Sequence, residues 1–164
     1  MKYIKEWGPY VGIILLVILL RAYIITPVRV EGKSMDPTLQ NNEILLLKKY
    51  DKKIDRFDIV VLRYNGDKLI KRVIGLPGEH IKYEDGILYI NQKKVDENFH
   101  HGATLDFDLK ELGYEVIPDN CYLVLGDNRM GSLDSRVFGP VSKNKIEGIT
   151  DFSLFPFSKF GAIK

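Results

Sequence analysis

A long uncharged stretch near the start of the chain places the strongest constraint on its fold. No charged residue lies between Trp7 and Leu20, and Val11–Leu20 is almost purely aliphatic. Extended to Ile25, the stretch covers 19 residues. As an α-helix it would be roughly 28 Å long, close to the ~30 Å hydrocarbon thickness of a bilayer. We therefore expect a single transmembrane helix in this part of the chain.

The flanks of this stretch help to distinguish a retained anchor from a cleaved leader. Trp7 and Tyr23 are suited to the two interfacial zones of a bilayer. Lys2 and Lys5 precede the apolar run, as they would in a signal peptide, but no small-x-small cleavage site follows it. We favour a retained anchor, with a short tail and one span in residues 1–27. Basic residues lie on both sides, so the positive-inside rule does not decide the orientation.

The remaining residues, 28–164, have the pattern of a mainly β domain. Short runs rich in Val, Ile and Tyr alternate with turn signals such as Asn65-Gly66-Asp67 and Glu84-Asp85-Gly86. The second signal predicts a tight hairpin. Helical periodicity is absent apart from a short turn around 142–147. We predict an antiparallel, partly closed β-barrel-like domain, with strands at Val28–Glu31, Glu43–Lys48, Asp58–Arg63, Leu69–Ile74, His80–Tyr83, Ile87–Ile90, Tyr122–Leu125 and Ile149–Leu154.

Composition argues against several classes of function. The formal net charge is +2, and no basic stripe is interleaved with aromatic residues, so no nucleic-acid partner is expected. Cys121 is the only cysteine, which excludes an intramolecular disulfide, and its apolar surroundings predict a buried structural thiol. The pair His100 and His101 lies in a polar stretch and is expected to be solvated. We therefore expect neither a metal nor another cofactor.

The first segment that could carry chemistry contains Ser34. Its sequence, Gly32-Lys33-Ser34, superficially matches the end of a phosphate-binding loop, but Pro27 stands where that motif requires a glycine. What remains is a serine on a turn between two strands, braced by Pro37. A serine on a turn usually has a structural role, so this segment alone does not indicate a nucleophile.

The second segment is the predicted strand around Lys71 and Arg72. Side chains of a strand alternate between two faces, so one of these cations has apolar neighbours on its face. A buried arginine stays charged, whereas a buried lysine can lose its proton and serve as a base. The alternative is an edge strand with both cations in water.

The third segment, Gly126–Arg136, follows an apolar strand and is dense in hydrogen-bonding side chains. It is either a polar surface loop or an organised network that fixes other side chains. The mixture of Asp, Asn, Arg and Ser within eleven residues favours a network.

In combination these segments resemble the boxes of bacterial type I signal peptidase, also called leader peptidase. The matching segments are Ser34–Leu39, Asp58–Arg63, Lys71–Glu79 and Gly126–Arg136, in this order. The resemblance reaches from the predicted anchor to Val137–Val141, nearly the whole chain. It implies a membrane-bound serine endopeptidase with a Ser/Lys dyad. Such an enzyme removes signal peptides from secreted preproteins by cleaving after small residues at −3 and −1.

The resemblance also implies roles for single residues. Ser34 corresponds to the nucleophile, and Lys71 to the general base that takes the serine proton and later activates the deacylating water. The supporting residues it implies are Ser132, which orients the lysine, Asp134 and Arg136, which buttress the site, and Asp127, which begins the loop.

Two positions depart from the pattern of some members. Gly32 stands where those members have a serine that donates to the oxyanion, so we expect the oxyanion hole to rely on backbone N–H groups, that of Ser34 among them. Gly131 replaces a commoner asparagine, which a loop should tolerate. A second membrane span and a large inserted domain are also missing, which resembles the minimal Gram-positive type.

The implied substrate is the extended end of a preprotein signal peptide. Strands Val28–Glu31 and Leu69–Ile74 could flank such a peptide, with Val30 and Leu69 as walls of a shallow pocket. The further implied partners are the lipid bilayer and, by proximity, the secretion translocon. The resemblance implies a single-pass protein of the cell membrane with a cytoplasmic N-terminus and an extracytoplasmic domain of residues 28–164.

Two other classes of protein remain as alternatives. Self-cleaving repressors share Ser/Lys chemistry, but they are soluble and carry a DNA-binding helix-turn-helix, which is not evident here. A catalytically inactive, membrane-anchored β-domain relative could act as a binding or assembly factor. Such relatives have lost the serine or the lysine, whereas Ser34 and Lys71 are both present.

Overall fold

The computed structural model describes residues 7, 10–17, 24–49 and 53–163, and the backbone is helical at residues 7 and 10–17. Within these ranges no helix is long and apolar enough to cross a membrane. The predicted span from Trp7 to Ile25 includes residues outside the described ranges, as does the predicted tail before it, and both remain predictions.

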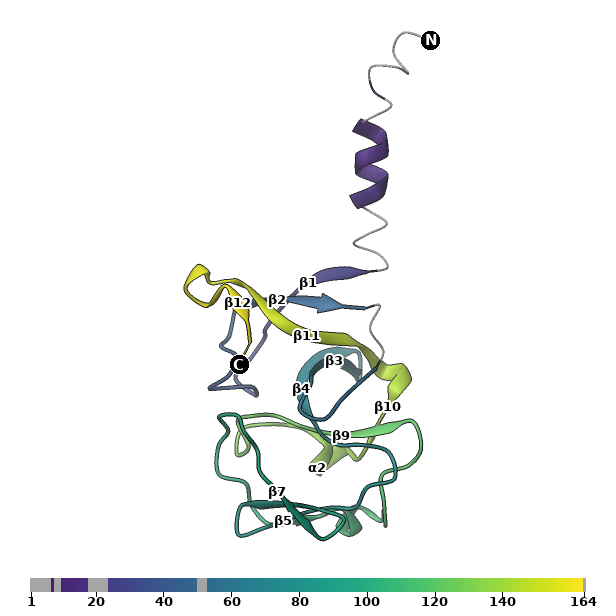
Figure 1. Ribbon diagram of the computed structural model, residues 1–164, viewed down its shortest axis with the longest axis vertical. Coiled ribbons are helices and arrows are strands. Elements are labelled where there is room, and N and C mark those ends of the chain that lie inside the picture. The colour runs from purple at the N-terminus through teal and green to yellow at the C-terminus, as the bar shows by residue number, and fades with distance from the viewer. Residues whose placement is uncertain (1–6, 8–9, 18–23, 50–52, 164) are drawn as a thin grey trace.

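The described chain forms two antiparallel sheets (Figure 1). The large sheet has eight strands in the order β1-β2-β11-β3-β4-β9-β10, with β12 paired to β11, and the small sheet has the order β7-β6-β5-β8. The strands are β1 (Ile25–Arg29), β2 (Ile44–Lys48), β3 (Ile59–Tyr64), β4 (Asp67–Gly75), β5 (Ile81–Glu84), β6 (Ile87–Ile90), β7 (Lys93–Val95), β8 (Phe107–Asp108), β9 (Cys121–Leu125), β10 (Val141–Ser142), β11 (Ile146–Phe155) and β12 (Gly161–Ala162).

The mainly β, antiparallel prediction is confirmed, but the described strands form no closed barrel. β1 and β10 stand at the two ends of an open path in the large sheet. β1 also begins earlier than predicted, because Ile25 and Thr26 pair with Lys48 and Leu47 of β2. The strand therefore crosses the predicted boundary between anchor and domain at residue 28.

Two-residue turns fix the register of two hairpins. β5 and β6 are joined by Asp85 and Gly86, with φ values of 51° and 75°, which confirms the predicted hairpin. β3 and β4 are joined in the same way by Asn65 and Gly66, at 50° and 93°. Paired positive φ values match the right-handed twist of the flanking strands, which is why Asn, Asp and Gly are favoured there.

Strand β4 lies where three apolar cores meet. Ile70 belongs to the core beneath β1 and β2, Val73 to the core formed with β3, β9 and β11, and Ile74 to the core shared with the small sheet. Every residue of β4 from Ile70 to Gly75 is consequently buried. This position enclosed by cores decides the environment of the two cations in the same strand.

Helical segments in the described domain are short: η1 (Leu109–Leu112), α2 (Ser135–Phe138), η2 (Lys143–Lys145) and η3 (Phe157–Lys159). The turn predicted around 142–147 corresponds to η2. Cys121 was expected to be buried, but it begins β9 at the margin of the core and is half-buried.

Candidate active site

Ser34 stands on a turn that its neighbours anchor in the core. The chain leaves β1 in extended form, with hydrogen bonds between Val30 and residues 42 and 43, and turns at Gly32, where φ is +86°. Met35 and Leu39 are 1% and 0% exposed. Because both sides of the turn are fixed, the half-buried Ser34 side chain is held in one place.

Lys71 of β4 reaches the same place from the other side. Its side chain is buried, and its Nζ lies 2.7 Å from Ser34 Oγ. A second hydrogen bond, 3.1 Å long, goes to the carbonyl of Ile70. The structure therefore brings together two sequence-predicted residues that are 37 positions apart.

Burial changes the proton affinity of Lys71. It lowers the pKa of the ammonium from 10.5 to about 8, although the carboxylates of Asp134 and Asp127 act in the opposite direction. A lysine with such a pKa is partly neutral near physiological pH. A neutral amine 2.7 Å from a hydroxyl can accept its proton.

Arg72 is also buried, which the alternation of side chains along the strand did not predict. Both cations are enclosed because β4 has cores on both faces, and Arg72 is neutralised by an ion pair. Its Nε and Nη2 lie 2.9 and 2.6 Å from the two carboxylate oxygens of Asp127. Asp127 also accepts a hydrogen bond of 2.6 Å from Thr38 Oγ1. Asp127 thus ties β4 to the turn that carries Ser34.

Asp134 and Arg136, predicted as a pair, are in contact. Arg136 Nε and Nη2 lie 2.9 and 2.8 Å from the carboxylate of Asp134, which is 0% exposed. Asp134 also accepts from the N–H of Gly126 at 3.1 Å and from the N–H of Arg136, where it caps α2. The predicted network in Gly126–Arg136 is therefore observed, in place of a loose surface loop.

Ser132 lies close to the dyad without a hydrogen bond to it. Its hydroxyl is buried and has no hydrogen-bond partner in the described part of the chain. A Cβ on Gly126 would come within 2.2 Å of Ser132 Oγ and 2.3 Å of the Ser34 carbonyl oxygen. Only glycine fits at position 126, where the loop packs directly on the backbone of Ser34.

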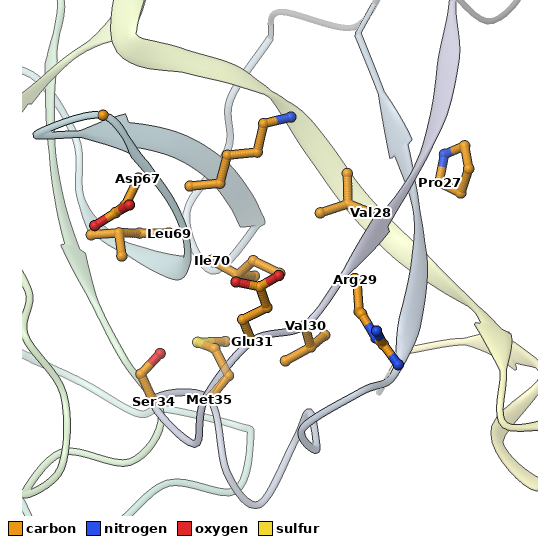
Figure 2. Close-up of a pocket in the computed structure, with 12 residues that line it drawn as sticks. Pro27, Val28, Arg29, Val30, Glu31, Ser34, Met35, Asp67, Leu69 and Ile70 are labelled. Carbon is orange, nitrogen blue, oxygen red and sulfur yellow. The ribbon is translucent and has the colours of Figure 1, made fainter.

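A cleft of about 590 Å³ runs from Ser34 between β1 and β4. Figure 2 shows Ser34 at one end of the cleft and Pro27 at the other. Val30 and Leu69, the two predicted pocket residues, both line it. The other lining residues are Pro27, Val28, Arg29, Glu31, Ser34, Met35, Gly66, Asp67, Lys68 and Ile70.

Comparison with known proteins defines the class. The family model described as "Signal peptidase, peptidase S26" matches residues 4–155. Signal peptidase I of Bacillus caldolyticus is 43% identical over 95% of this chain and 93% of its own. Signal peptidase IB of Staphylococcus aureus (strain COL) is 36% identical over 97% and 93%. A crystal structure of a signal peptidase I from Enterococcus faecalis V583 matches with a TM-score of 0.55 and 38% identity, over 59% of this chain and 96% of the other.

The family match and the identity to these relatives show that the chain is a peptidase. It belongs to the signal peptidase family, peptidase S26. The resemblance drawn from the motifs is confirmed. The predicted activity, removal of signal peptides by a hydrolase, is confirmed with it.

Proposed function

We propose that Ser34 and Lys71 are the catalytic dyad of a membrane-bound serine endopeptidase that releases signal peptides. The observation that carries the proposal is the 2.7 Å contact between Ser34 Oγ and the buried Lys71 Nζ. Neutral Lys71 accepts the serine proton as Oγ attacks the scissile carbonyl, and the ammonium then protonates the leaving amine. Neutral again, Lys71 takes a proton from the water that hydrolyses the acyl-enzyme.

The oxyanion is stabilised in this proposal by the backbone N–H of Ser34. That N–H has no acceptor among the described residues. The N–H of Gly32 is already donated to Asn41 Oδ1 at 2.9 Å. An N–H on the nucleophile itself points to where negative charge develops in the tetrahedral intermediate, so it acts in the transition state.

Five further residues keep this geometry. Asp127 and Arg72 link the Ser34 turn to β4. Asp134 and Arg136 shape the loop that packs on Ser34 through Gly126. We assign to Ser132 the orientation of neutral Lys71, because its buried hydroxyl is next to the dyad and has no partner in the described ranges.

The substrate enters the cleft as an extended strand. Among the described strands, β1 pairs with β2 alone, and one edge of β4 has no partner over residues 67–71, because β9 pairs with β4 from Arg72 onward. Backbone hydrogen bonds to two free edges would hold a peptide between them. Val30 and Leu69 then wall the pockets and admit only small side chains at −3 and −1.

The pH dependence follows from Lys71. Since the base must be neutral, kcat/KM should fall as the pH drops below about 8. Two pH units below the pKa only about one lysine in a hundred is neutral, so the rate should be about 100-fold lower there. Preprotein cleavage at low substrate concentration, followed from mildly acidic to alkaline pH, measures this. A flat profile would contradict a titrating base.

The pocket assignment predicts a change of specificity. Leu69 is half-buried, lines the cleft and also packs against one apolar core. Leu69→Ala should widen the pocket, so kcat/KM should rise for preproteins with valine at −1 relative to those with alanine. A few methylene groups are worth about tenfold in the ratio of kcat/KM values. The matched control is Leu105→Ala, because Leu105 is 63% exposed and lies outside the cleft. An unchanged ratio in Leu69→Ala would remove Leu69 from the pocket.

The anchor and the topology complete the proposal. Ser34 follows the predicted end of the span by nine residues. Its site would then lie at the membrane surface, where signal peptides emerge near the secretion translocon. Confinement of enzyme and preprotein to one bilayer raises their effective concentration. Because signal peptides are cut after crossing, the domain should be extracytoplasmic and the N-terminus cytoplasmic.

Protease accessibility tests this orientation. Protease added to intact, wall-stripped cells should degrade a tag placed after Lys164 and spare one placed before Met1. Both tags should be degraded once the membrane is broken, which controls for resistance of the tag itself. Protection of the C-terminal tag in intact cells would place the domain inside and overturn the proposed topology.

A further inference from the structure

The loop of residues 126–136 holds a second buried arginine, Arg129. The side chain of Arg129 is 0% exposed. Its guanidinium donates to the carbonyl of Gly126 at 3.1 Å, to Thr104 Oγ1 at 2.7 Å and to the hydroxyl of Tyr83 at 3.1 Å. A charge at this depth must be paired with an opposite one.

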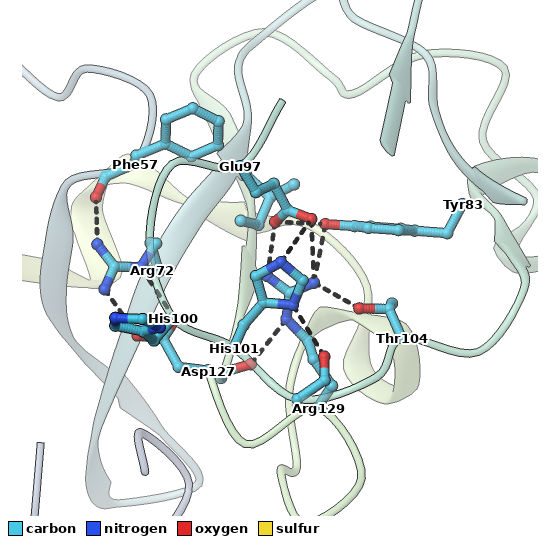
Figure 3. A network of polar contacts seen from close by, with 12 residues as sticks. Phe57, Arg72, Tyr83, Glu97, His100, His101, Thr104, Asp127 and Arg129 are labelled. Carbon is cyan, nitrogen blue, oxygen red and sulfur yellow. Dashed lines mark hydrogen bonds and ion pairs between the residues drawn. The ribbon is translucent and has the colours of Figure 1, made fainter. Parts of the chain in front are cut away.

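Glu97 supplies the opposite charge (Figure 3). Its side chain is 5% exposed, and its Oε1 lies 2.6 Å from Arg129 Nη2. The same carboxylate accepts from Tyr83 OH at 3.0 Å and lies 3.5 Å from His101 Nε2. No other carboxylate in the described ranges forms an ion pair with Arg129. Glu97 belongs to none of the recognised motifs and lies between β7 and β8 of the small sheet.

The chain after Glu97 contacts the ion pair of Arg72 and Asp127. The ring of Phe99 lies 4.0 Å from the guanidinium of Arg72. The N–H of Gly102 donates to the carbonyl of Asp127 at 2.8 Å. The segment of residues 97–104 therefore contacts both members of the ion pair that ties β4 to the Ser34 turn. The segment belongs to the small sheet, between β7 and β8, and packs by these contacts against β4 of the large sheet.

If Arg129 moved, Gly126 would move with it, and Gly126 is in direct contact with the backbone of Ser34. Arg129 Nε holds the carbonyl of Gly126, and Gly126 packs on the Ser34 carbonyl so closely that no side chain fits between them. The carbonyl of Arg129 also accepts from Arg136 Nη2 at 2.6 Å. The guanidinium of Arg129 thus fixes the start of the loop, and the carbonyl of Arg129 ties its middle to Arg136 at its end.

We propose that Glu97 is a positioning residue of the peptidase reaction. By pairing with Arg129 it holds the 126–136 loop against Ser34, so that the groups around Lys71 keep their places during turnover. The inference rests on the proposed roles of Ser34 and Lys71. It adds a residue from the small sheet, outside the motifs, whose loss should slow the chemical step and leave substrate binding in place.

The experiment is Glu97→Gln in the full-length chain, assayed with a preprotein. Glutamine keeps the shape and removes the charge, so kcat should fall about tenfold. KM should stay within about twofold, because Glu97 does not line the cleft. Glu97→Asp keeps the charge and should recover part of kcat. Glu115→Gln is the matched control, since Glu115 is 80% exposed and pairs with Lys110. Wild-type kcat in Glu97→Gln would overturn the proposal.

Hydrogen exchange separates positioning from general stabilisation. Backbone amides of the 126–136 loop should exchange faster in Glu97→Gln, while those of the β5–β6 hairpin keep their protection. An equal increase across the small sheet and the loop would mean that Glu97 only stabilises the fold, and would overturn the proposal.

A double variant covers the case in which Glu97→Gln fails to fold. Glu97→Gln with Arg129→Met removes both buried charges, which proteins often tolerate. It should fold and remain slow, because the Gly126 carbonyl has lost its donor. Wild-type kcat in the double variant would overturn the proposal. Ser34→Ala is assayed in parallel: residual cleavage there would count against the proposed function, whatever the result at Glu97.

Discussion

Ser34→Ala and Lys71→Ala should each abolish signal-peptide processing while the fold is kept. Without Oγ no acyl-enzyme forms, and without the neutral amine the hydroxyl is not activated. The two groups act as a unit, so each single loss should lower kcat by about 10⁴-fold or more, and the double variant should be no slower. Lys71→Arg should be equally inactive, because a guanidinium stays protonated. Cleavage of a preprotein by each purified variant measures the effect.

Thermal unfolding of the same variants supplies the control for folding. Lys82→Ala is the matched control for loss of a cation, because Lys82 is half-buried on the outer side of β5 and forms an ion pair with Glu84. Lys82→Ala should process preproteins at the wild-type rate. Near-wild-type turnover by Lys71→Arg would show that Lys71 is not the general base. Turnover by Ser34→Ala would exclude Ser34 as the nucleophile.

Among the substitutions considered, Asp127→Asn should lower the free energy of unfolding the most. The change leaves Arg72, 7% exposed at its side chain, charged and without its anionic partner. Breaking a buried ion pair from one side costs about 3–5 kcal/mol, because the remaining charge is not solvated. The Thr38 hydrogen bond is weakened at the same time, so the Ser34 turn should shift and processing should fall. Denaturant unfolding of the detergent-solubilised chain measures the free energy of unfolding.

The surface ion pair of Lys48 and Asp151 provides the comparison. Asp151 is 57% exposed at its side chain, so Asp151→Asn should change the free energy of unfolding by less than about 1 kcal/mol. If Asp127→Asn were equally mild, the pair of Arg72 and Asp127 would not hold β4 to the turn. The proposed role of Asp127 as a structural link would then be wrong.

The residues of the dyad could be predicted from sequence, but their contact could not. Ser34 and Lys71 lie in short local motifs, and motif order along the chain led to the family. Their 2.7 Å contact depends on how strands distant in sequence are arranged, including β11 between β2 and β3. No local pattern encodes that order of strands.

The burial of both Lys71 and Arg72 shows where strand periodicity fails. The alternation of side chains predicts burial correctly only when one face of the sheet is exposed to solvent. On that assumption only one of the two cations has apolar surroundings. β4 has apolar cores on both faces. Lys71 is enclosed without a carboxylate partner at hydrogen-bond distance among the described residues, whereas Arg72 is paired with Asp127. That difference in partners could not be read from the strand itself.

The shortest strands and the arrangement of the sheets were also beyond sequence reasoning. β8, β10 and β12 have two residues each and β7 has three, too few for any periodicity. Whether the sheet closes depends on its edge strands, and the large sheet remains open between β1 and β10. Glu97 was missed for a related reason: it lies in a polar connection, and only the fold brings it to Arg129.

Titration of Lys71 itself is the most direct test of the proposed mechanism. Carbon-13 NMR of the full-length chain labelled at lysine Cε, with the Lys71 signal assigned by its loss in Lys71→Ala, follows each lysine separately. The structure predicts a midpoint of about 8 for Lys71, below the ordinary lysine value of 10.5. A Lys71 signal that titrated near 10.5 would contradict the proposal of a neutral base beside Ser34.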